Sequence, residues 1–371
     1  MRCNICMSEV SRILFHQDET EIWTNADDTR EFKNLKYPCD LLQCDHCGHI
    51  QQPNSTTLSC HLDKIYNSNQ HALSTLPGIG NWGAEIGNEV LLYFDKINFN
   101  DVSSACEIGF GNDFYLQHLS KNKVSTLYGI EPSIASDHIS NGIHFIKGYA
   151  DQKVDLGINF DLIYAMNVFE HVHDLSSIFI FINKHIKENG KLFFCIPNCE
   201  AQLISGDTAL FIHEHYNYFT QKTLHELLKI NGFGSIQMHV TMDTYYVHAL
   251  KNKNIANDSK QIIIDKYDYV GKLETNLEIL NQKCRGKKVA FHGVCNSLNN
   301  ILSWSNLKFD LILFDNDITK KDKKYFGTTV LIPDSEILKG VEVVVILPRA
   351  YNLSIEKQYI DLDFQGEILK F

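Results

Sequence analysis

The sequence predicts an α/β fold for most of this 371-residue chain. We expect a doubly wound parallel sheet in the middle, a small β domain before it and a smaller α/β domain after it. Three observations favour this division. Two Cys-x-x-Cys pairs stand near the N-terminus, apolar runs alternate with helical patterns through the middle, and four further apolar runs follow a polar stretch near the C-terminal end.

The N-terminal segment, residues 1–61, is defined by two cysteine pairs. The four cysteines are Cys3, Cys6, Cys44 and Cys47. Two such pairs can place four thiolates around one tetrahedral ion, which suits a structural Zn²⁺. A segment of this size has little core of its own, so the ion would supply much of its folding free energy. The alternative is a set of unligated thiols in a small β domain.

Residues 62–253 show the alternation of apolar runs and helical patterns that is typical of a doubly wound sheet. The expected strands are 104–108, 126–130, 160–165 and 190–196. Ligands of such folds bind outside the carboxyl ends of the strands. The residues that follow these runs are therefore the candidates for a binding site.

After a helical linker at 254–285, residues 286–371 repeat the pattern on a smaller scale. The apolar runs lie within 286–294, 309–316, 340–347 and 366–371. Gly293 follows the first run and Asp315 ends the second, so a loop there could approach a ligand closely. The pattern fits a second nucleotide-binding lobe and a structural cap equally well.

The composition narrows the function classes. A net charge of −11 argues against a general nucleic-acid surface. No apolar run approaches the ~20 residues that span a bilayer, so no membrane segment is expected. The N-terminus has no hydrophobic signal core, which favours a cytoplasmic protein. Eleven cysteines in such a chain are expected to be reduced thiols, some of them metal ligands.

The most informative stretch follows the first strand of the middle segment. Glu107, Gly109 and Gly111 form a Glu-x-Gly-x-Gly turn, and the next apolar run ends in Glu131. Glycines after a strand let backbone N–H groups approach a ligand. An acidic residue at the end of the next strand can accept both hydroxyls of a ribose. An NAD site is the competing interpretation, but the third glycine of that fingerprint is absent and Phe114 occupies the stretch.

Together with the run Phe160–His171, these residues resemble the class I S-adenosylmethionine (SAM)-dependent methyltransferases, whose core is Rossmann-like. The resemblance implies that the glycine loop, with Glu107, approaches the amino-acid part of SAM and that Glu131 holds its ribose. The residues implied to line the floor near the methionine moiety are Ala165, Met166 and Asn167. Tyr149 is a further candidate, for the adenine contact.

The order of the three segments resembles the sugar-nucleotide C-methyltransferases. These enzymes combine a cysteine-knuckle domain, a SAM-binding core and a small Rossmann-like C-terminal domain. The most specific shared stretches, besides the four cysteines, are Gly129–Ser133, His213–Phe219 and Gly286–Gly293. The resemblance implies a nucleoside-diphosphate-linked keto-deoxysugar as the substrate. We expect a monomer or a homodimer.

The run His213-Glu-His215 carries the expected catalytic chemistry, just before a predicted helix at 221–230 with Thr220 as its N-cap. Methylating a carbon next to a ketone requires loss of an α-proton, and a histidine of near-neutral pKa is a natural base. By resemblance, His215 matches the family's base and Glu214 its acidic partner. His213 is the third catalytic candidate.

Other roles are open to these histidines. His213 and His215 could form a metal pair, or they could be structural histidines bonded to backbone carbonyls. His171 and His173, which follow the strand at 160–165, are expected to shape a loop.

The substrate contacts predicted outside the run are Tyr66, Tyr216, Asn296 and Ser297, with the loop Gly293–Ser297 facing the same cleft as His215. The family run usually opens with a tyrosine that contacts the sugar, and here Ile212 stands in that place. This departure leaves open O-methylation of a sugar hydroxyl in a glycan precursor. A non-catalytic, zinc-containing binding module is a third hypothesis, which the intact glycine loop and Glu131 argue against.

Overall fold

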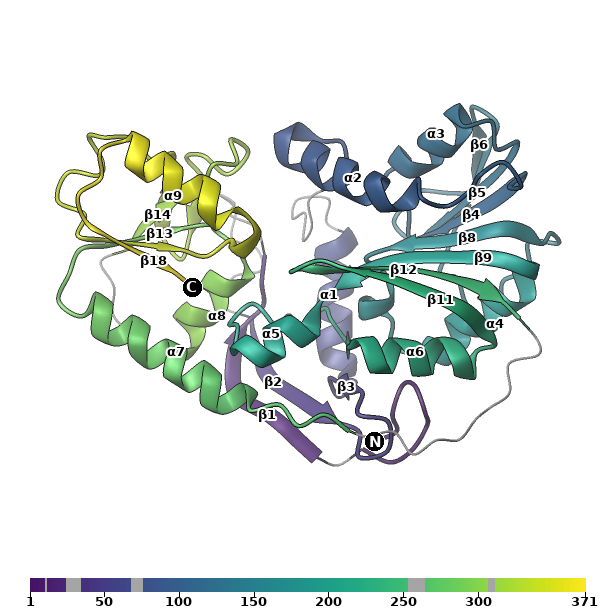
Figure 1. The fold of residues 1–371 in the computed structure, drawn as a ribbon, viewed down its shortest axis with the longest axis horizontal. Helices are drawn as coiled ribbons and strands as arrows, with labels where there is room; N and C mark the ends of the chain where they lie inside the picture. The colour runs from purple at the N-terminus through teal and green to yellow at the C-terminus, as the bar shows by residue number, and fades with distance from the viewer. Residues whose placement is uncertain (11, 25–34, 68–75, 253–263, 306–310) are drawn as a thin grey trace.

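The computed structural model describes residues 1–10, 12–24, 35–67, 76–252, 264–305 and 311–371. These residues form three β-sheets with helices packed against them (Figure 1). An eight-stranded sheet occupies the middle of the sequence, and a four-stranded and a six-stranded sheet belong largely to its two ends.

The central sheet has the strand order β11-β12-β9-β8-β4-β5-β7-β6. The pairs from β9 to β7 are parallel, as predicted. Antiparallel pairs at both edges, β11 with β12 with β9 and β6 with β7, make the sheet mixed. The strands are β4 (Ser104–Ile108), β5 (Thr126–Glu131), β6 (His138–Ser140), β7 (Ile143–Lys147), β8 (Phe160–Met166), β9 (Ile186–Pro197), β11 (Phe233–Val240) and β12 (Thr244–Lys251).

Helices cover both faces of this sheet, as a doubly wound fold requires. On one face lie α2 (Gly80–Phe94) and α3 (Phe114–Lys121), and on the other α4 (Leu175–His185) and α6 (Gln221–Ile230) (Figure 1). The predicted N-cap of α6 is confirmed: the Thr220 hydroxyl accepts a hydrogen bond from the Thr223 N–H at 3.3 Å.

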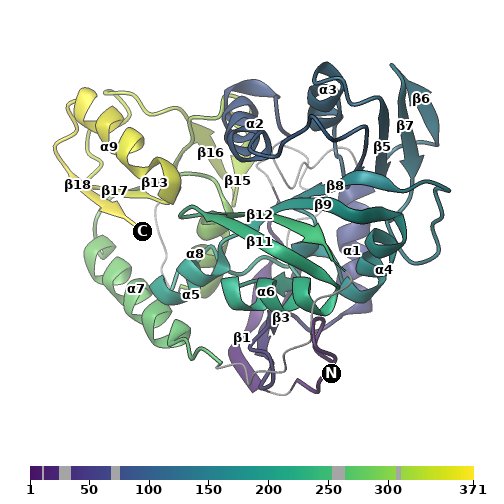
Figure 2. The ribbon, with the colours of Figure 1, turned by 45° about the vertical axis from the view of Figure 1, so that its right-hand side comes forward.

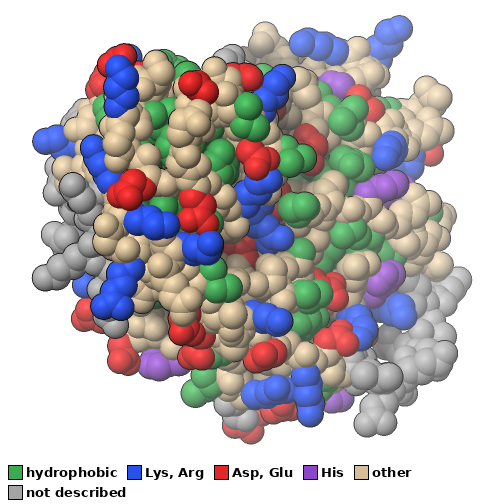
Figure 3. All heavy atoms as spheres, turned by 60° about the vertical axis from the view of Figure 1, so that its left-hand side comes forward, with side chains coloured by type: hydrophobic (Ala, Val, Ile, Leu, Met, Phe, Trp, Pro, Cys, Tyr) green, Lys and Arg blue, Asp and Glu red, His purple; other side chains and the backbone are tan. Residues whose placement is uncertain are grey.

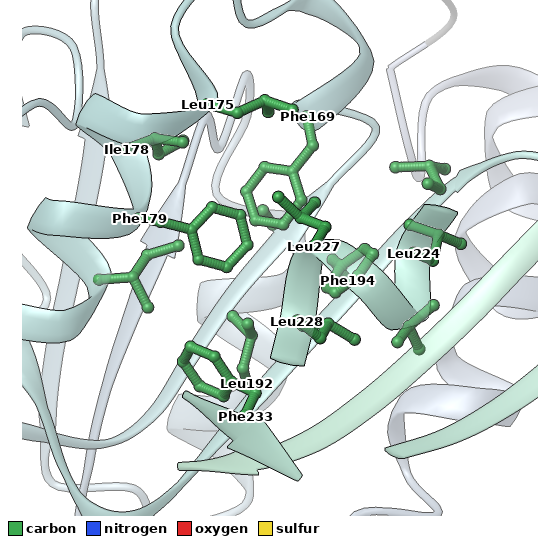
Figure 4. Close-up of a cluster of buried hydrophobic side chains, with 14 of the residues drawn as sticks. Phe169, Leu175, Ile178, Phe179, Leu192, Phe194, Leu224, Leu227, Leu228 and Phe233 are labelled. Atoms are coloured by element: carbon green, nitrogen blue, oxygen red, sulfur yellow. The ribbon is translucent and has the colours of Figure 1, made fainter. Parts of the chain in front are cut away.

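The space beneath α4 and α6 is filled by aromatic and aliphatic side chains (Figure 4). Phe169, Phe179 and Phe194 are fully buried there, and the rings of Phe169 and Phe194 lie 4.8 Å apart. Burial of one such ring contributes ~1.5–3 kcal/mol, and replacing Phe179 with alanine would cost about 3–5 kcal/mol. Because Phe169 begins the short helix η1 (Phe169–His171), this core holds the end of β8 in place.

The N-terminal sheet has the order β1-β2-β3-β10, and its last strand comes from the middle of the chain. The strands are β1 (Arg12–Glu21), β2 (Lys36–Gln43), β3 (Ile50–Gln51) and β10 (Asn217–Tyr218). The predicted boundary between residues 61 and 62 falls inside helix α1 (Thr56–Asn67). The N-terminal segment is therefore joined to the core through a shared sheet and a continuous helix.

The C-terminal sheet has the order β15-β16-β14-β13-β17-β18 and lies beside the central sheet (Figure 2). Its strands are β13 (Val289–His292), β14 (Ile312–Phe314), β15 (Lys324–Tyr325), β16 (Thr328–Leu331), β17 (Val343–Ile346) and β18 (Glu367–Lys370), with helices α8 (Asn296–Trp304), η2 (Arg349–Tyr351) and α9 (Asn352–Asp361). Each predicted apolar run contains a strand, and the pairs β13–β14, β13–β17 and β17–β18 are parallel.

The linker predicted at 254–285 contains helix α7 (Tyr269–Cys284), and its first part, 254–263, lies outside the described residues. The C-terminal part contacts both others. Trp304 on α8 donates to the Thr20 hydroxyl at 2.8 Å, and Arg349 in η2 donates to Oδ2 of Asp207 at 2.7 Å, just after α5 (Cys199–Ser205). Within the described ranges, no helix is long and apolar enough to cross a membrane.

Candidate active site

The turn after β4 is built around two glycines in the left-handed conformation. Gly109 has φ 69° and Gly111 has φ 52°, values that favour glycine. A Cβ atom on Gly109 would lie 2.7 Å from Cγ2 of Val168, so a side chain there would displace the segment after β8. The Gly109 N–H donates to the Ile130 carbonyl at 2.8 Å. The turn therefore lies against the carboxyl ends of both neighbouring strands.

Glu131 ends β5 and is held by backbone donors on both carboxylate oxygens. Oε2 accepts the N–H of Gly111 at 3.2 Å, and Oε1 accepts the N–H of Ser133 at 3.0 Å. A carboxylate can accept about four hydrogen bonds. Two acceptor positions are thus used to fix the group beside the glycine turn, and two are left for a ligand such as a ribose.

Glu107 lies in the sheet beneath the turn, with 1% of its surface exposed. The Tyr164 hydroxyl donates to its Oε2 at 3.0 Å. Burial raises the pKa of Glu107 well above its usual range, and the hydrogen bond from Tyr164 opposes that rise. This geometry gives Glu107 a supporting position under the loop, and direct contact with a cofactor stays a prediction.

The end of β8 lies next to this turn. Ala165 is buried, Met166 is half-buried and Asn167 is exposed with φ 54°. The Asn167 N–H donates to the Cys195 carbonyl at 2.9 Å, which fixes the bend. Tyr149 is 66% exposed. Burial, and then the carboxylates of Asp63 and Glu131, raise the pKa of Tyr149. Its contact with adenine stays a prediction.

One segment over the glycine turn was missed by the sequence analysis. The Asn112 side-chain amide donates to the Pro77 carbonyl at 2.8 Å, and Leu76 Cδ2 would lie 3.3 Å from a Cβ on Gly111. Gly78 adopts φ 76° against the ring of Phe114. The Pro77-Gly78 pair is a turn signal that could have marked this segment.

The His213-Glu-His215 run lies against η1, at the end of β8. The Tyr216 N–H donates to the Glu170 carbonyl at 2.7 Å, and His171 Nδ1 donates to the Glu214 carbonyl at 3.0 Å. The rings of His171 and His215 meet edge to face with centroids 4.8 Å apart. His171, which was predicted only to shape a loop, is therefore part of the same cluster as His215.

The protonation of this cluster is governed by burial. Desolvation, and then the proximity of His171, hold the pKa of His215 well below its usual range. Desolvation raises the pKa of Glu170 to about 7. Oε2 of Glu170 is buried without a hydrogen-bond partner among the described residues. Burial thus favours the neutral forms of the His215 imidazole and the Glu170 carboxyl group.

His213 lies apart from this cluster. Its Nε2 is 3.4 Å from the Tyr37 carbonyl, its ring packs edge to face against Phe211, and burial lowers its pKa to about 4. No metal-ligand group of the described residues contains both His213 and His215. The metal pair considered from the sequence therefore has no counterpart there, whereas Glu170, His171 and His215 do form such a group.

A buried side chain from the N-terminal segment holds the run from the other side. Gln52 Nε2 lies 2.9 Å from the Ile212 carbonyl and 3.3 Å from the His213 carbonyl, and it also contacts the His215 carbonyl. Asn217 is fully buried: Nδ2 donates to the Phe169 and Val172 carbonyls at 3.0 and 2.7 Å, and Oδ1 accepts from Asn4 at 2.8 Å. The N-terminal segment thus fixes the position of the run.

Residues 84–237 match the family model described as "Methyltransferase domain". The chain carries a SAM-dependent methyltransferase domain. A search of curated proteins found no match.

Solved structures include similar chains at low identity. A putative SAM-dependent methyltransferase from Listeria monocytogenes is 11% identical with a TM-score of 0.35, over 44% of this chain and 99% of that one. The PH0226 protein from Pyrococcus horikoshii is 13% identical with a TM-score of 0.39, over 47% and 94%. Human N-acetylserotonin methyltransferase, solved with SAM, is 16% identical with a TM-score of 0.37, over 46% and 52%.

The glycine turn after β4 and the carboxylate of Glu131 fit SAM. The glycine turn leaves room for close approach of a ligand, and Glu131 is fixed with free acceptor positions beside it. The cofactor roles of the individual residues, from Glu107 to Asn167, stay predictions.

The four N-terminal cysteines fit a tetrahedral ion. Sγ of Cys3 lies 3.5 Å from that of Cys47, and Sγ of Cys6 lies 3.6 Å from that of Cys44. All four sulfur atoms lie within 4.8 Å of one another. At a Zn–S distance of ≈ 2.3 Å, tetrahedral sulfurs stand about 3.8 Å apart, so small shifts would accommodate Zn²⁺. The N-terminal knuckles therefore have a geometry compatible with the predicted zinc.

The predicted substrate residues have different surroundings. Tyr216 is buried, with its hydroxyl 3.3 Å from that of Ser59. The side chain of Tyr66, on α1, lies outside the described residues. Asn296 donates to the Phe211 carbonyl at 2.7 Å, and the Ser297 hydroxyl is hydrogen-bonded to that of Thr208. These two side chains bind the segment before His213, so their contact with a substrate stays a prediction.

The C-terminal loop is likewise closed by internal contacts. Gly293 has φ 107°, and the Val294 N–H donates to Asp315 Oδ2 at 2.9 Å. Lys320 contacts the same carboxylate oxygen at 2.9 Å. Asp315 is thus engaged within the loop. On the face drawn in Figure 3, basic side chains are interspersed with acidic ones.

Proposed function

We propose that this enzyme transfers the methyl group of SAM to a nucleotide-linked keto-deoxysugar, at the carbon next to the ketone. The observation that carries the proposal is the position of His215. His215 lies beside Glu170 and His171, and these two residues belong to the segment that continues directly from Met166 and Asn167 at the end of β8.

The chain's own residues account for the proton transfer. Val168 lies against Gly109 of the glycine turn, and His171 follows three residues later. The base cluster, formed by Glu170, His171 and His215, therefore lies next to the cofactor edge, formed by the glycine turn, Glu131 and Ala165–Asn167. Burial holds the pKa of His215 well below its usual range, so its imidazole is neutral and can accept the α-proton. The lowered pKa also makes it a weaker base than the histidine of near-neutral pKa expected from the sequence. When bound, SAM supplies an electrophilic methyl group to the resulting enolate carbon.

Glu214 and His213 have different parts in this proposal. The Glu214 carbonyl accepts the hydrogen bond that orients the ring of His171. Glu214 itself is buried, with 8% of its surface exposed. His213 packs against Tyr37 and Phe211, which supports a structural role over a catalytic one. Of the three catalytic candidates, His215 is the proposed base.

The nucleotide-linked substrate is supported by the organisation of the chain. The C-terminal part binds the segment that leads into the His213–His215 run: Asn300 donates to the Thr208 and Phe211 carbonyls at 2.7 and 2.8 Å. A long substrate with a sugar at one end and a nucleotide at the other would suit a site between two such parts. The resemblance to the sugar-nucleotide C-methyltransferases points the same way.

O-methylation of a sugar hydroxyl is the second candidate. It is favoured by Ile212, which packs with the C-terminal core where the family run offers a tyrosine hydroxyl. His215 would then accept the hydroxyl proton.

Proton exchange separates these functions. The protein is incubated in D₂O with nucleotide-linked keto-deoxysugars and S-adenosylhomocysteine, and exchange at the α-carbon is followed by NMR. C-methylation predicts exchange that is lost in His215→Asn and kept in His225→Asn, a control at an exposed histidine of α6. Methyl transfer from SAM without any exchange would support the oxygen acceptor. Neither exchange nor a mass gain of one methyl group would refute the sugar-nucleotide proposal.

A further inference from the structure

We infer that Glu170, His171 and His215 form a second metal site, for a divalent transition-metal ion, distinct from the four N-terminal cysteines. One ligand atom from each residue, two imidazole nitrogens and a carboxylate oxygen, lies within 4.8 Å of the other two. The donors come from two segments, η1 and the run before β10, that are separated by 43 residues between His171 and Glu214.

The two segments are held together before any ion binds. The Tyr216 N–H donates to the Glu170 carbonyl at 2.7 Å, and His171 Nδ1 donates to the Glu214 carbonyl at 3.0 Å. Each link joins a residue of η1 to a residue next to His215. These two hydrogen bonds hold η1 against the run on both sides of His215, so the three donors stay close together without an ion.

The bond from His171 to Glu214 also sets the ring for metal binding. A carbonyl can only accept, so Nδ1 carries the proton and Nε2 presents a lone pair. Metal-binding histidines usually donate their other N–H to such a partner, which orients the ring. Nε2 of His171 lies 3.9 Å from Oε1 of Glu170, and the His171 side chain is 27% exposed, which gives an ion access from solvent.

The burial of Glu170 supports the metal site independently of this geometry. Its side chain is 2% exposed, and its Oε2 has no hydrogen-bond partner among the described residues. A buried carboxylate oxygen without a partner is costly. A divalent cation between the three side chains would bring positive charge to this buried carboxyl group and bind both imidazole nitrogens.

The donor set selects the class of ion. Imidazole suits Zn²⁺, Fe²⁺, Ni²⁺ and Cu²⁺, whereas Mg²⁺ and Ca²⁺ prefer oxygen ligands. At metal–ligand distances of about 2.1 Å, tetrahedral donors stand about 3.4 Å apart, so the site would contract by about 1 Å on binding. Three protein ligands leave further positions for water or a bound molecule.

Metal binding has a consequence that rests on the proposed function. An ion bound by His215 occupies the lone pair that would accept the substrate proton. Occupation of this site therefore blocks proton abstraction. Zinc added beyond the ion expected at the four cysteines would inhibit methyl transfer, and a chelator too weak to strip the cysteine site would reverse this inhibition.

Counting bound cobalt tests the site without reference to activity. The protein, stripped of metal and refilled with Co²⁺, is analysed for ion content and optical spectrum. We expect two ions per chain: one with the thiolate-to-cobalt charge-transfer absorption of the cysteine site, and one without it. Glu170→Gln and His171→Gln should each lower the affinity for the second ion by ~100-fold or more. The control His225→Asn should still bind both ions.

Two results would overturn the inference: wild-type protein that binds a single ion, or a second ion that persists unchanged in Glu170→Gln or His171→Gln. Calorimetric SAM binding shows which variants are folded, and the half-buried position of His171 makes its variant the safer of the two. Because the ion count needs no acceptor, it stands even if the nucleotide-sugar substrate is wrong. Reversible zinc inhibition is then measured with whichever acceptor is methylated.

Discussion

The cofactor edge and the base cluster lie side by side but are built in different ways. The cofactor edge consists of turns that directly follow β4, β5 and β8, with the segment at 76–78 packed over the first of them. The base cluster is assembled from η1, the run before β10 and residues of the N-terminal segment such as Gln52 and Asn4. A local site can be disturbed by changing one turn, whereas an assembled site depends on every segment that meets there.

Removing the metal expected at the four cysteines should have the largest effect and should separate the two regions. Structural zinc contributes about 10–16 kcal/mol of apparent binding free energy in small domains. Asn4 stands between Cys3 and Cys6, and its side chain is hydrogen-bonded to that of Asn217. Loss of the metal should therefore loosen the base cluster. Limited proteolysis near the N-terminus should accelerate and methyl transfer should fall, while calorimetric SAM affinity changes by less than about tenfold.

If removal of the metal lowered SAM affinity as much as it lowered methyl transfer, the cofactor edge would also depend on the N-terminal segment.

His215→Asn should come next, with kcat reduced by ~10²–10⁴-fold because a general base is lost. The SAM dissociation constant should stay within about twofold, since no cofactor residue is changed. Steady-state kinetics with calorimetry measure both quantities, and His225→Asn is the control. An unchanged kcat would exclude His215 as the base.

Asn217→Ala should destabilise the assembled region by about 2–3 kcal/mol, because it leaves the buried Phe169 and Val172 carbonyls without a donor. Urea unfolding measures the loss. The control is Asn231→Ala, whose side chain donates to the Leu227 carbonyl at the end of α6, away from the cluster. If both variants lost equal stability and equal methyl transfer, the bonds of Asn217 would have no special weight.

Tyr164→Phe should have the smallest effect, about 1 kcal/mol of stability, through loss of the hydrogen bond to Glu107. The same bond opposes the rise in the pKa of Glu107, so its removal should raise that pKa further. A SAM affinity reduced by more than tenfold would instead indicate that Glu107 takes a direct part in cofactor binding.

The contrast also explains what the sequence could predict. The central strands β4, β5, β8 and β9, the glycine turn and Glu131 were recognised because their signals lie within a few consecutive residues. The edge strands β6, β7, β11 and β12 were not among the expected strands. The contact between His171 and His215 was missed, because nothing in a linear pattern shows that residues 44 positions apart in sequence meet across a chain turn.

Contacts between segments explain the remaining differences. Asn296 and Ser297 were predicted to face a substrate on the strength of the glycine loop before them. Their side chains bind the segment at 208–211. The strand β10, of only two residues, pairs with β3 because both are buried next to the cysteine knuckles, and two residues carry no periodic pattern.

The central claim is that SAM binds at the turn after β4 with its ribose on Glu131, independently of the base cluster. Calorimetric titration of SAM into wild type, Glu131→Ala and His215→Asn tests it directly. We predict equal affinity for wild type and His215→Asn, and a loss of ~10–100-fold for Glu131→Ala, the equivalent of one or two hydrogen bonds to a charged group. No binding to the wild type, or undiminished binding to Glu131→Ala, would contradict it.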